Sequence, residues 1–466
     1  MSTIELFISK MKENHLPQAA IDTFILYYTQ LQSGSTGFIS DEEIKPLDPR
    51  DIDDYSEIES YSKYGRDFLR KTVLIKLNGG LGTTMGLQGP KSLIPVKNGL
   101  SFLDITALQI RSMNHQNGFP TPLILMNSFN TEQETCQELQ KYPDLKTGIP
   151  ESFIQHMFPK ILKTNLTPAQ YPENPQLEWN PSGHGDLYTS LSTSGTLDKL
   201  LKAGYRYAFV SNIDNLGANL DTRTLGYFAV KEFSFLMEVT DRTWMDRKGG
   251  HLARHNKGHL VLREEAQCPP EELKQFRDIS RYSFFNTNNL WVDLQALNDL
   301  LKRKNNILEL PMIRNLKRLN PLDPDSQEVF QLESAMGTAI SVFNKASAIR
   351  VPRSRFAPVK NCEELLLLWS DYYQLTDDYR IKCNPVNNCS RLTITLDPKF
   401  YSRLDHLQQR FPFGAPSLVE CNDLTITGDV RFGKNVKIRG KINISNPKPT
   451  QEEIPDNTLI EKDILL

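Results

Sequence analysis

The chain has 466 residues, a formal net charge of -2 at pH 7 and 24% charged residues. This length exceeds one ordinary hydrophobic core and predicts a main domain with appended modules. Positive and negative residues are nearly balanced, so the protein as a whole has no positive field that would attract nucleic acid. The six cysteines include no C-x-x-C pair, so neither a disulfide framework nor a structural zinc is expected. The chain lacks a signal-like start and any run of about 18 apolar residues, so we expect a cytoplasmic protein without a membrane partner.

Residues 1–60 are predicted to form a helical N-terminal segment followed by an acidic linker. Apolar residues such as Ile4, Phe7 and Met11 recur at helical spacing, and Ser2 with Glu5 has the pattern of a capping box. The stretch 40–60 is rich in Asp and Glu and is interrupted by two prolines. Such charge runs are usually solvated, so we expect a connecting segment there.

Residues 61–360 are predicted to form a Rossmann-like α/β catalytic core. Short apolar runs at 73–77, 122–126, 207–211, 233–239 and 288–294 alternate with helical stretches. Continuous apolar strands separated by crossovers predict a mostly parallel sheet that is covered on both faces. In such sheets, ligands bind beyond the carboxyl ends of the strands.

A glycine-rich stretch, "LNGGLGTTMGLQGPK", follows the first of these strands at residues 77–91. It is not a dinucleotide fingerprint, because its glycines read G-x-G-x-x-x-G. It is not a P-loop either, because Pro90 separates Gly89 from Lys91. Glycines let backbone N–H groups approach an anion closely, and Lys91 is placed to reach a second phosphate. A flexible surface loop is the alternative.

Three further polar stretches follow predicted strands or turns. His184 and Asp186 lie in "NPSGHGDLY", and Asn212 and Asp214 end "YAFVSNIDNLG", where a carboxylate suits Mg²⁺. The third stretch, "VPRSRFAPVK", contains Arg353, Arg355 and Lys360. Each also has an ordinary explanation, namely a turn, a helix cap and a solvated basic face.

Together these stretches resemble one family in the same order along the chain. The family is that of the eukaryotic UTP:glucose-1-phosphate uridylyltransferases, also called UDP-glucose pyrophosphorylases. The similarity runs from about residue 60 to residue 445. The motifs that carry it are "LNGGLGTTMGLQGPKSLIPV", "LILMNSFNT", "GHGDLYTSL", "FVSNIDNLGA", "FNTNNLWV", "QLESAMGTAI" and "VPRSRFAPVK".

The resemblance implies a role for each matching residue. Uridine would be bound by the first loop, assisted by a glutamine and a glycine, and the matching residues are Leu77, Asn78, Gly79, Gly80, Gln155 and Gly183. Lys91 matches the triphosphate lysine, His184 the sugar-phosphate histidine, Asp214 the carboxylate that binds Mg²⁺, and Lys360 the lysine at the reaction centre. Further polar contacts to nucleotide or hexose match Asn212, Asn288 and Glu238.

The implied reaction is the Mg²⁺-dependent, reversible transfer of UMP from UTP to glucose 1-phosphate, by direct in-line attack without a covalent intermediate. In the wider superfamily an arginine follows the G-x-G-T element, where this chain has Thr84, so Lys360 is the candidate for that contact. Two alternatives stay open: the same chemistry on galactose 1-phosphate or an N-acetylhexosamine 1-phosphate, or a uridine-nucleotide binding protein without turnover.

The C-terminal residues 416–466 show a six-residue repeat. Leu424, Val430, Val436 and Ile442 recur at this interval, with glycines at the corners. This period predicts a left-handed β-helix, with a plain β-meander as the alternative. Residues 361–415 would continue the core and connect to it. So short a coil must pack on the main domain or on another subunit, which would make a homo-oligomer.

Overall fold

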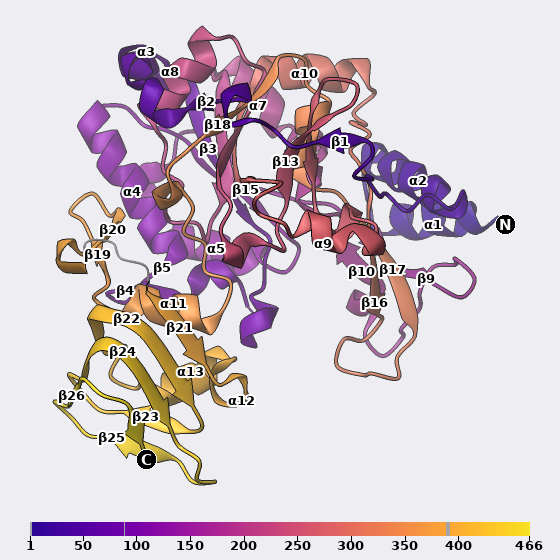
Figure 1. The fold of residues 1–466 in the computed structure, drawn as a ribbon. Helices are drawn as coiled ribbons and strands as arrows, with labels where there is room; N and C mark the ends of the chain where they lie inside the picture. The colour runs from indigo at the N-terminus through magenta and orange to yellow at the C-terminus, as the bar shows by residue number, and fades with distance from the viewer. Residues whose placement is uncertain (1, 88, 388–391) are drawn as a thin grey trace.

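The computed structural model describes residues 2–87, 89–387 and 392–466 (Figure 1). Helices α1 (Thr3–Glu13) and α2 (Gln18–Gln32) form the N-terminal lead-in, and the capping box of Ser2 and Glu5 is confirmed. Their buried aromatic residues, including Phe7 and Phe24, pack against Phe158 in the body of the protein. The predicted lead-in is therefore docked rather than free.

The acidic segment differs from the solvated connector that we expected. Its strands β1 (Ile44–Lys45) and β2 (Asp53–Asp54) pair with β13 (His251–His255) and β18 (Ala346–Arg350), respectively, so the segment runs along the main sheet. Ile44, Leu47, Ile52 and Ile58 are buried, whereas most acidic side chains between them are exposed. The expectation was wrong because it was based on the many charged residues of the segment. Its few aliphatic side chains are buried, and they are sufficient to hold the segment against the sheet.

The central sheet is mostly parallel, as predicted. The order of its main path is β2, β18, β12, β15, β11, β3, β6, β7, and β15 alone runs antiparallel to both of its neighbours on that path. The remaining bounds on this path are β3 (Thr72–Asn78), β6 (Leu123–Asn127), β7 (Ser152–Ile154), β11 (Tyr207–Asn212), β12 (Phe235–Asp241), β15 (Phe284–Asp293) and β18 (Ala346–Arg350).

Helices cover both faces of this sheet because consecutive strand residues point to opposite sides. Leu74 of β3 packs in one core cluster, whereas Val73 and Ile75 pack in the other. The first cluster also contains residues of α4 (Phe102–Asn117), α5 (Glu132–Leu139), α8 (Thr222–Val230) and α11 (Cys362–Trp369), and α3 (Ser62–Phe68) packs on α8. The second contains residues of α6 (Leu187–Thr193), α7 (Thr196–Lys202) and α10 (Leu294–Arg303).

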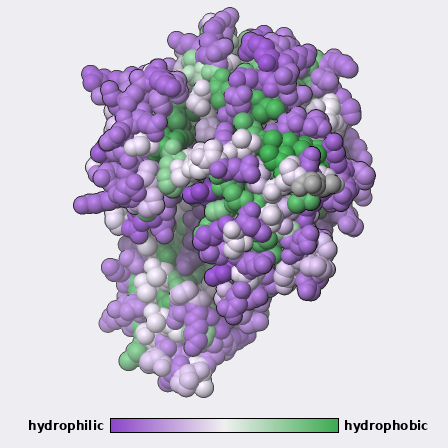
Figure 2. Space-filling model, turned by 90° about the vertical axis from the view of Figure 1, so that its right-hand side faces the viewer, coloured by the Kyte–Doolittle hydropathy of each residue, from purple (hydrophilic) through white to green (hydrophobic). Residues whose placement is uncertain are grey.

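Smaller elements surround the sheet. Strands β13 (His251–His255) and β14 (Leu260–Arg263) extend it, next to the short helix α9 (Leu273–Phe276). The other small sheets are β4–β5 (Pro95–Lys97 and Leu100–Ser101), β8–β10 (Met157–Pro159 and Trp179–Pro181), β9–β17–β16 (Ile161–Leu162, Glu328–Glu333 and Ile313–Arg318) and β19–β20 (Tyr373–Leu375 and Ile381–Cys383). The face in Figure 2 is mostly hydrophilic, with hydrophobic side chains in the middle of its upper part. Among the described residues, no helix combines the length and the apolar character that crossing a bilayer requires.

The C-terminal module is a stack of parallel strands. Strand β22 (Ser417–Thr427) pairs in parallel with β21 (Thr393–Leu396) and β24 (Lys437–Ser445), and β24 pairs with β26 (Leu459–Ile460) and β27 (Ile464–Leu465). Strand β23 (Val430–Phe432) pairs with β25 (Glu452–Ile454), while α12 (Pro398–Tyr401) and α13 (Leu404–Arg410) lie in the preceding segment. Parallel pairing excludes a meander, whose neighbouring strands would be antiparallel.

The six-residue repeat faces the interior of this stack. Leu424 and Val430 are fully buried, Val436 and Ile442 are at most 2% exposed, and Leu424 lies opposite Ile442 in the next layer. The same core cluster contains α11 and the adjoining face of the main sheet, so the coil packs on its own main domain. The left hand of the coil and a role in joining subunits stay predictions.

Replacing Val436 by Asp should destabilise the coil, because an unpaired carboxylate would be buried at a cost of several kcal/mol. We expect a lower melting temperature in thermal denaturation followed by circular dichroism. Thr427 is exposed at the end of β22, so Thr427→Asp introduces the same charge on the outer face of the coil and serves as the control. Equal melting temperatures for the two variants would contradict an inward position for Val436.

Candidate active site

The glycine-rich loop and Asp214 meet because two parallel strands end side by side. In the register of β3 and β11, Leu77 lies opposite Asn212, and the backbone N–H of Ile213 donates to the carbonyl of Leu77 at 3.1 Å. The loop that leaves β3 and the turn that leaves β11 therefore begin at the same edge of the sheet. This is the position at which open α/β sheets bind ligands.

Glycine is required at particular points of the loop. Gly82 has a φ of 61°, a left-handed conformation, and a Cβ there would lie 2.6 Å from a methyl group of Leu87. At Gly79 a Cβ would lie 2.3 Å from the side-chain nitrogen Nε2 of Gln155. The structure thus places the backbone of the first loop directly against the predicted uracil-binding glutamine. Gly80 is exposed, and its carbonyl accepts from the N–H of Lys91 at 3.1 Å.

Lys91 and Asp214 form an ion pair at this edge. Their side chains are 16% and 15% exposed, and the Nζ of Lys91 donates to a carboxylate oxygen of Asp214. Lys76 lies in the protein interior near this pair, and its Nζ donates to the hydroxyl of Ser211 at 2.8 Å and to the carbonyl of Ala218 at 3.1 Å. Burial lowers the pKa of Lys76 to about 7, while the charge of Asp214 acts in the opposite direction.

Gly183 and His184 lie where a second chain segment passes very close. Gly183 has a φ of 86°, and a Cβ there would approach the backbone of Ser334 to 2.5 Å. The backbone N–H of Met336 donates to the Nδ1 of His184 at 3.0 Å. Burial of the ring lowers the pKa of His184 to about 4. The imidazole is therefore neutral at pH 7, and with Nδ1 as acceptor its proton lies on Nε2, which is the donor available to a ligand.

Asn288 lies in a β-bulge of β15. The register between β12 and β15 shifts at this point, and Asn288 has a φ of 57°. Its side-chain oxygen accepts from the amide of Asn286 at 2.8 Å, and its N–H donates to the side-chain oxygen of Asn286 at 2.9 Å. Bulges near active sites turn a side chain away from the regular pleat.

Glu238 lies in the protein interior. It is fully buried and paired with Arg355, and its carboxylate also accepts from Trp291 and Asn289, each at 3.0 Å. Protein donors thus surround this carboxylate, and the structure does not bring it together with the other predicted site residues at the end of β3. Arg353, from the same motif as Arg355, pairs with Asp246. Arg355 is therefore an interior residue, whereas Arg353 and Lys360 are exposed, as in the solvated face considered for this motif.

Lys360 enters from the segment before α11. Its side chain is exposed, and its ammonium group lies 5.9 Å from the ring centroid of Phe285 and 5.8 Å from that of Phe356. Its backbone N–H donates to the carboxylate of Glu364 in α11. Burial raises the pKa of Glu364, and the charges of Lys360 and Lys91 both act to lower it. Glu364 therefore lies within electrostatic reach of both predicted catalytic lysines.

Three residues near the predicted site were missing from the sequence-based predictions, namely Lys76, Glu364 and His156. Lys76 has a signal, since it is a lysine inside an otherwise apolar strand run. Glu364 has none beyond its position in the first turn of α11. Asp186 stood in a quoted motif, but its buried partner His156 did not. The side chain of Thr84 lies outside the described part of the chain.

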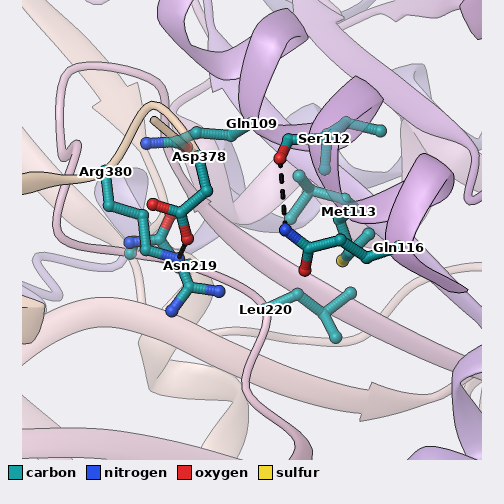
Figure 3. Close-up of a pocket in the computed structure, with 11 residues that line it drawn as sticks. Gln109, Ser112, Met113, Gln116, Asn219, Leu220, Asp378 and Arg380 are labelled. Carbon is teal, nitrogen blue, oxygen red and sulfur yellow. Dashed lines mark hydrogen bonds and ion pairs between the residues drawn. The ribbon is translucent and has the colours of Figure 1, made fainter. Parts of the chain in front are cut away.

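A separate cavity lies between α4 and the loop after β11 (Figure 3). Gln109, Met113 and Gln116 of α4 face Asn219 and Leu220, and Asp378 with Arg380 closes one side. None of the predicted site residues lines it. The cavity therefore does not mark the predicted active site.

The protein offers few ligands for a metal ion at this site, so substrate phosphates would have to supply most of the coordination. Among the described residues, no three His, Cys, Asp or Glu side chains are grouped so that they could hold a metal ion. Asp214 offers one carboxylate beside Lys91. This donor set fits Mg²⁺, which proteins commonly hold through one or two carboxylates together with substrate phosphates and water.

Known proteins are similar in sequence to this chain over most of its length. The model of a family described as UTP--glucose-1-phosphate uridylyltransferase matches residues 21–439. The chain belongs to this family of nucleotidyltransferases. It is 42% identical to the UTP--glucose-1-phosphate uridylyltransferase of Solanum tuberosum over 402 residues, which is 86% of this chain and 82% of that protein. It is 38% identical to that of Encephalitozoon cuniculi over 459 residues, 98% and 89% of the two chains.

Solved structures of relatives match over the whole chain. A UDP-glucose phosphorylase of Trypanosoma brucei superposes with a TM-score of 0.91 at 42% identity, covering 100% of this chain and 99% of that one. A variant UDP-glucose pyrophosphorylase of Leishmania major, solved in complex with UDP-glucose, gives a TM-score of 0.92 at 40% identity and full coverage of both chains. The resemblance inferred from the sequence motifs is thereby confirmed at the level of the family.

The environment of His184 predicts that its ring does not titrate near neutral pH. Because the folded-state pKa is lowered from 6.5 to about 4, its contribution to stability is present above pH 6.5 and is lost as pH falls towards 4. We expect its NMR ring signals, assigned with a His184→Asn variant, to stay constant from pH 8 to pH 5.5. A midpoint near 6.5 would contradict the buried, neutral ring.

Proposed function

We propose that this protein transfers UMP from UTP to glucose 1-phosphate, forming UDP-glucose and pyrophosphate, and that the reaction is reversible. The observation that carries the proposal is the meeting of Lys91, Asp214 and the glycine-rich loop at the joint end of β3 and β11. Family membership over nearly the whole chain adds to it, as does the UDP-glucose bound by the Leishmania major relative.

The chemistry follows from charge. A phosphate oxygen of glucose 1-phosphate attacks the α-phosphorus of UTP in line, a new P–O bond forms, and the bond to the β-phosphate oxygen breaks with release of pyrophosphate. The attacking oxygen is already anionic, so no general base is required. The protein has to position two anions and reduce their repulsion, and both effects are large for phosphoryl-type transfer.

Lys91 and Lys360 are proposed to supply the positive charge. Lys91 follows directly on the loop that would hold the triphosphate, so we assign it to the β- and γ-phosphates that leave. Lys360 approaches from the α11 side and is assigned to the α-phosphate and the incoming phosphate. Glu364 is proposed to balance part of their charge before the substrates arrive, since the charges of both lysines act on its carboxylate.

His184 and Gln155 are proposed to orient the two substrates. A neutral His184 would donate from Nε2 to the sugar phosphate, because its Nδ1 is occupied by the N–H of Met336. Gln155 carries a carboxamide, which offers both a donor and an acceptor to the uracil edge. Asn212 and Asn288 would add polar contacts to nucleotide or hexose.

Asp214 is proposed to hold Mg²⁺ together with phosphate oxygens. When bound there, Mg²⁺ would neutralise phosphate charge and help to fix the geometry of the triphosphate. In this arrangement Lys91 would exchange its contact with Asp214 for phosphate oxygens, and Lys76 would balance part of the carboxylate charge from below.

The substrate proposal is tested by measuring pyrophosphate release from UTP with different sugar phosphates. We expect turnover with glucose 1-phosphate and much less with galactose 1-phosphate or N-acetylglucosamine 1-phosphate. Preference for another sugar phosphate would redirect the substrate assignment. UTP binding without turnover on any of them would favour a non-catalytic binding protein.

Removing either lysine should slow the reaction strongly. Lys360→Ala and Lys91→Ala each remove one preorganised charge, so kcat should fall by about 100- to 1,000-fold, and Lys91→Ala should also raise KM for UTP. The exposed Lys202 in α7 provides a matched control, since Lys202→Ala removes the same charge elsewhere. Wild-type kcat in a folded lysine variant would remove that residue from the mechanism.

Asp214→Asn keeps the side-chain shape but removes the anionic metal ligand. We expect roughly a tenfold or greater loss of activity and a higher Mg²⁺ concentration for half-maximal rate. Asp241→Asn is the control, because Asp241 is an exposed carboxylate paired with Arg350. An unchanged Mg²⁺ dependence in Asp214→Asn would speak against the assigned ligand.

A further inference from the structure

A buried carboxylate–imidazole pair lies directly behind the site. One carboxylate oxygen of Asp186 is 2.9 Å from the Nδ1 of His156, and the other accepts from the backbone N–H of His156 at 2.6 Å. The two side chains are 7% and 9% exposed. Because a carboxylate at this position only accepts, Nδ1 carries the proton. On its far side the ring is 3.1 Å from the hydroxyl of Thr193 in α6, through Nε2.

This pair fixes the backbone on one side of Gln155. The N–H of Gln155 donates to the carbonyl of Asn127 at 2.8 Å, which fixes its other side. The carbonyl of His156 accepts from the N–H and the hydroxyl of Ser182, at 3.1 and 2.9 Å. The direction in which the Gln155 side chain leaves the backbone is thus set by Asn127, Asp186 and Ser182.

Asp186 also belongs to the turn that carries His184. Its N–H donates to the carbonyl of Gly183 at 3.1 Å, and the N–H of Gly185 donates to the carbonyl of Ser334 at 2.8 Å. The segments around residues 155, 184 and 334 are therefore joined through one buried network. Networks of this kind, when every member is satisfied, hold a single arrangement rigidly.

We propose that Asp186 and His156 are positioning residues that hold Gln155 in register with the Gly183–His184 turn and thereby set the preference for uridine over cytidine nucleotides. The proposal rests on the proposed function, which assigns Gln155 to uracil. Uracil and cytosine differ in the donor and acceptor pattern of one edge, so discrimination requires the carboxamide in a defined orientation. A displacement of about 1 Å is sufficient to lose most of such an effect.

The experiment compares kcat/KM for UTP and CTP in single variants. Asp186→Asn leaves a single side-chain oxygen to accept from the backbone N–H and the Nδ1–H of His156. His156→Gln removes the Nδ1–H that donates to Asp186. Both should lower the UTP/CTP ratio by about tenfold, mainly through KM for UTP, while KM for glucose 1-phosphate changes little. His156→Asn keeps an amide nitrogen close to the Nδ1 position, so this variant should retain most of the wild-type UTP/CTP ratio. Asp198→Asn, in the first turn of α7, is the control for loss of a carboxylate.

A double-variant cycle with Gln155→Ala separates this proposal from the proposed function. If Gln155→Ala lowers the ratio and Asp186→Asn adds little in that background, Asp186 acts through Gln155, as proposed. If Gln155→Ala lowers the ratio but Asp186→Asn and His156→Gln keep the wild-type value, the positioning role is wrong. If Gln155→Ala leaves the ratio unchanged, the uracil assignment itself fails, and the positioning proposal fails with it. If Asp186→Asn does not fold, the UTP/CTP ratios of His156→Asn and His156→Gln are compared instead. A higher ratio in His156→Asn supports the positioning role, and equal ratios contradict it.

Discussion

The site depends on the parallel pairing of β3 with β11. This register sets the ends of the two strands at one edge, so that Lys91 from one loop and Asp214 from the next turn come into contact. A shift by one residue would move every side chain of a strand to the opposite face and separate the pair. Close packing around this edge also requires glycine at two points: Gly79 in the first loop passes against Gln155, and Gly183 in the later turn passes against Ser334, without room for a Cβ at either position.

Charge placed in advance is the common feature of the proposed chemistry. Lys91 and Asp214 form an ion pair where β3 and β11 end, the buried Lys76 lies near the same carboxylate, and the charges of Lys91 and Lys360 both act on Glu364. Such groups act in a partly buried setting, where electrostatic interactions are stronger than in water. The cost of holding like charges together is met when the fold forms, so that little reorganisation is needed when two anionic substrates bind.

Much of this architecture could be predicted because its signals are local. The Ser2 capping box, the apolar run at 73–77 and the six-residue repeat through Val436 each depend on neighbouring residues, and the structure contains all three. The docking of residues 40–60 and the His156–Asp186 pair could not be predicted, since both depend on partners distant in sequence. Glu238 shows the same limit, because its pairing with Arg355 joins positions 117 residues apart. Motif resemblance predicts the site, whereas the contacts that support its residues required the structure.

The central claim is a single in-line displacement on the α-phosphorus by preplaced cations, without a covalent intermediate. It is tested most directly by the stereochemistry of the reaction with UTP that carries sulfur at the α-phosphorus in one known configuration. ³¹P NMR of the UDP-glucose analogue formed from glucose 1-phosphate identifies the configuration of the product. The account predicts inversion at phosphorus, the outcome of one direct displacement. Retention would require two successive displacements through a covalent uridylyl intermediate and would contradict the account.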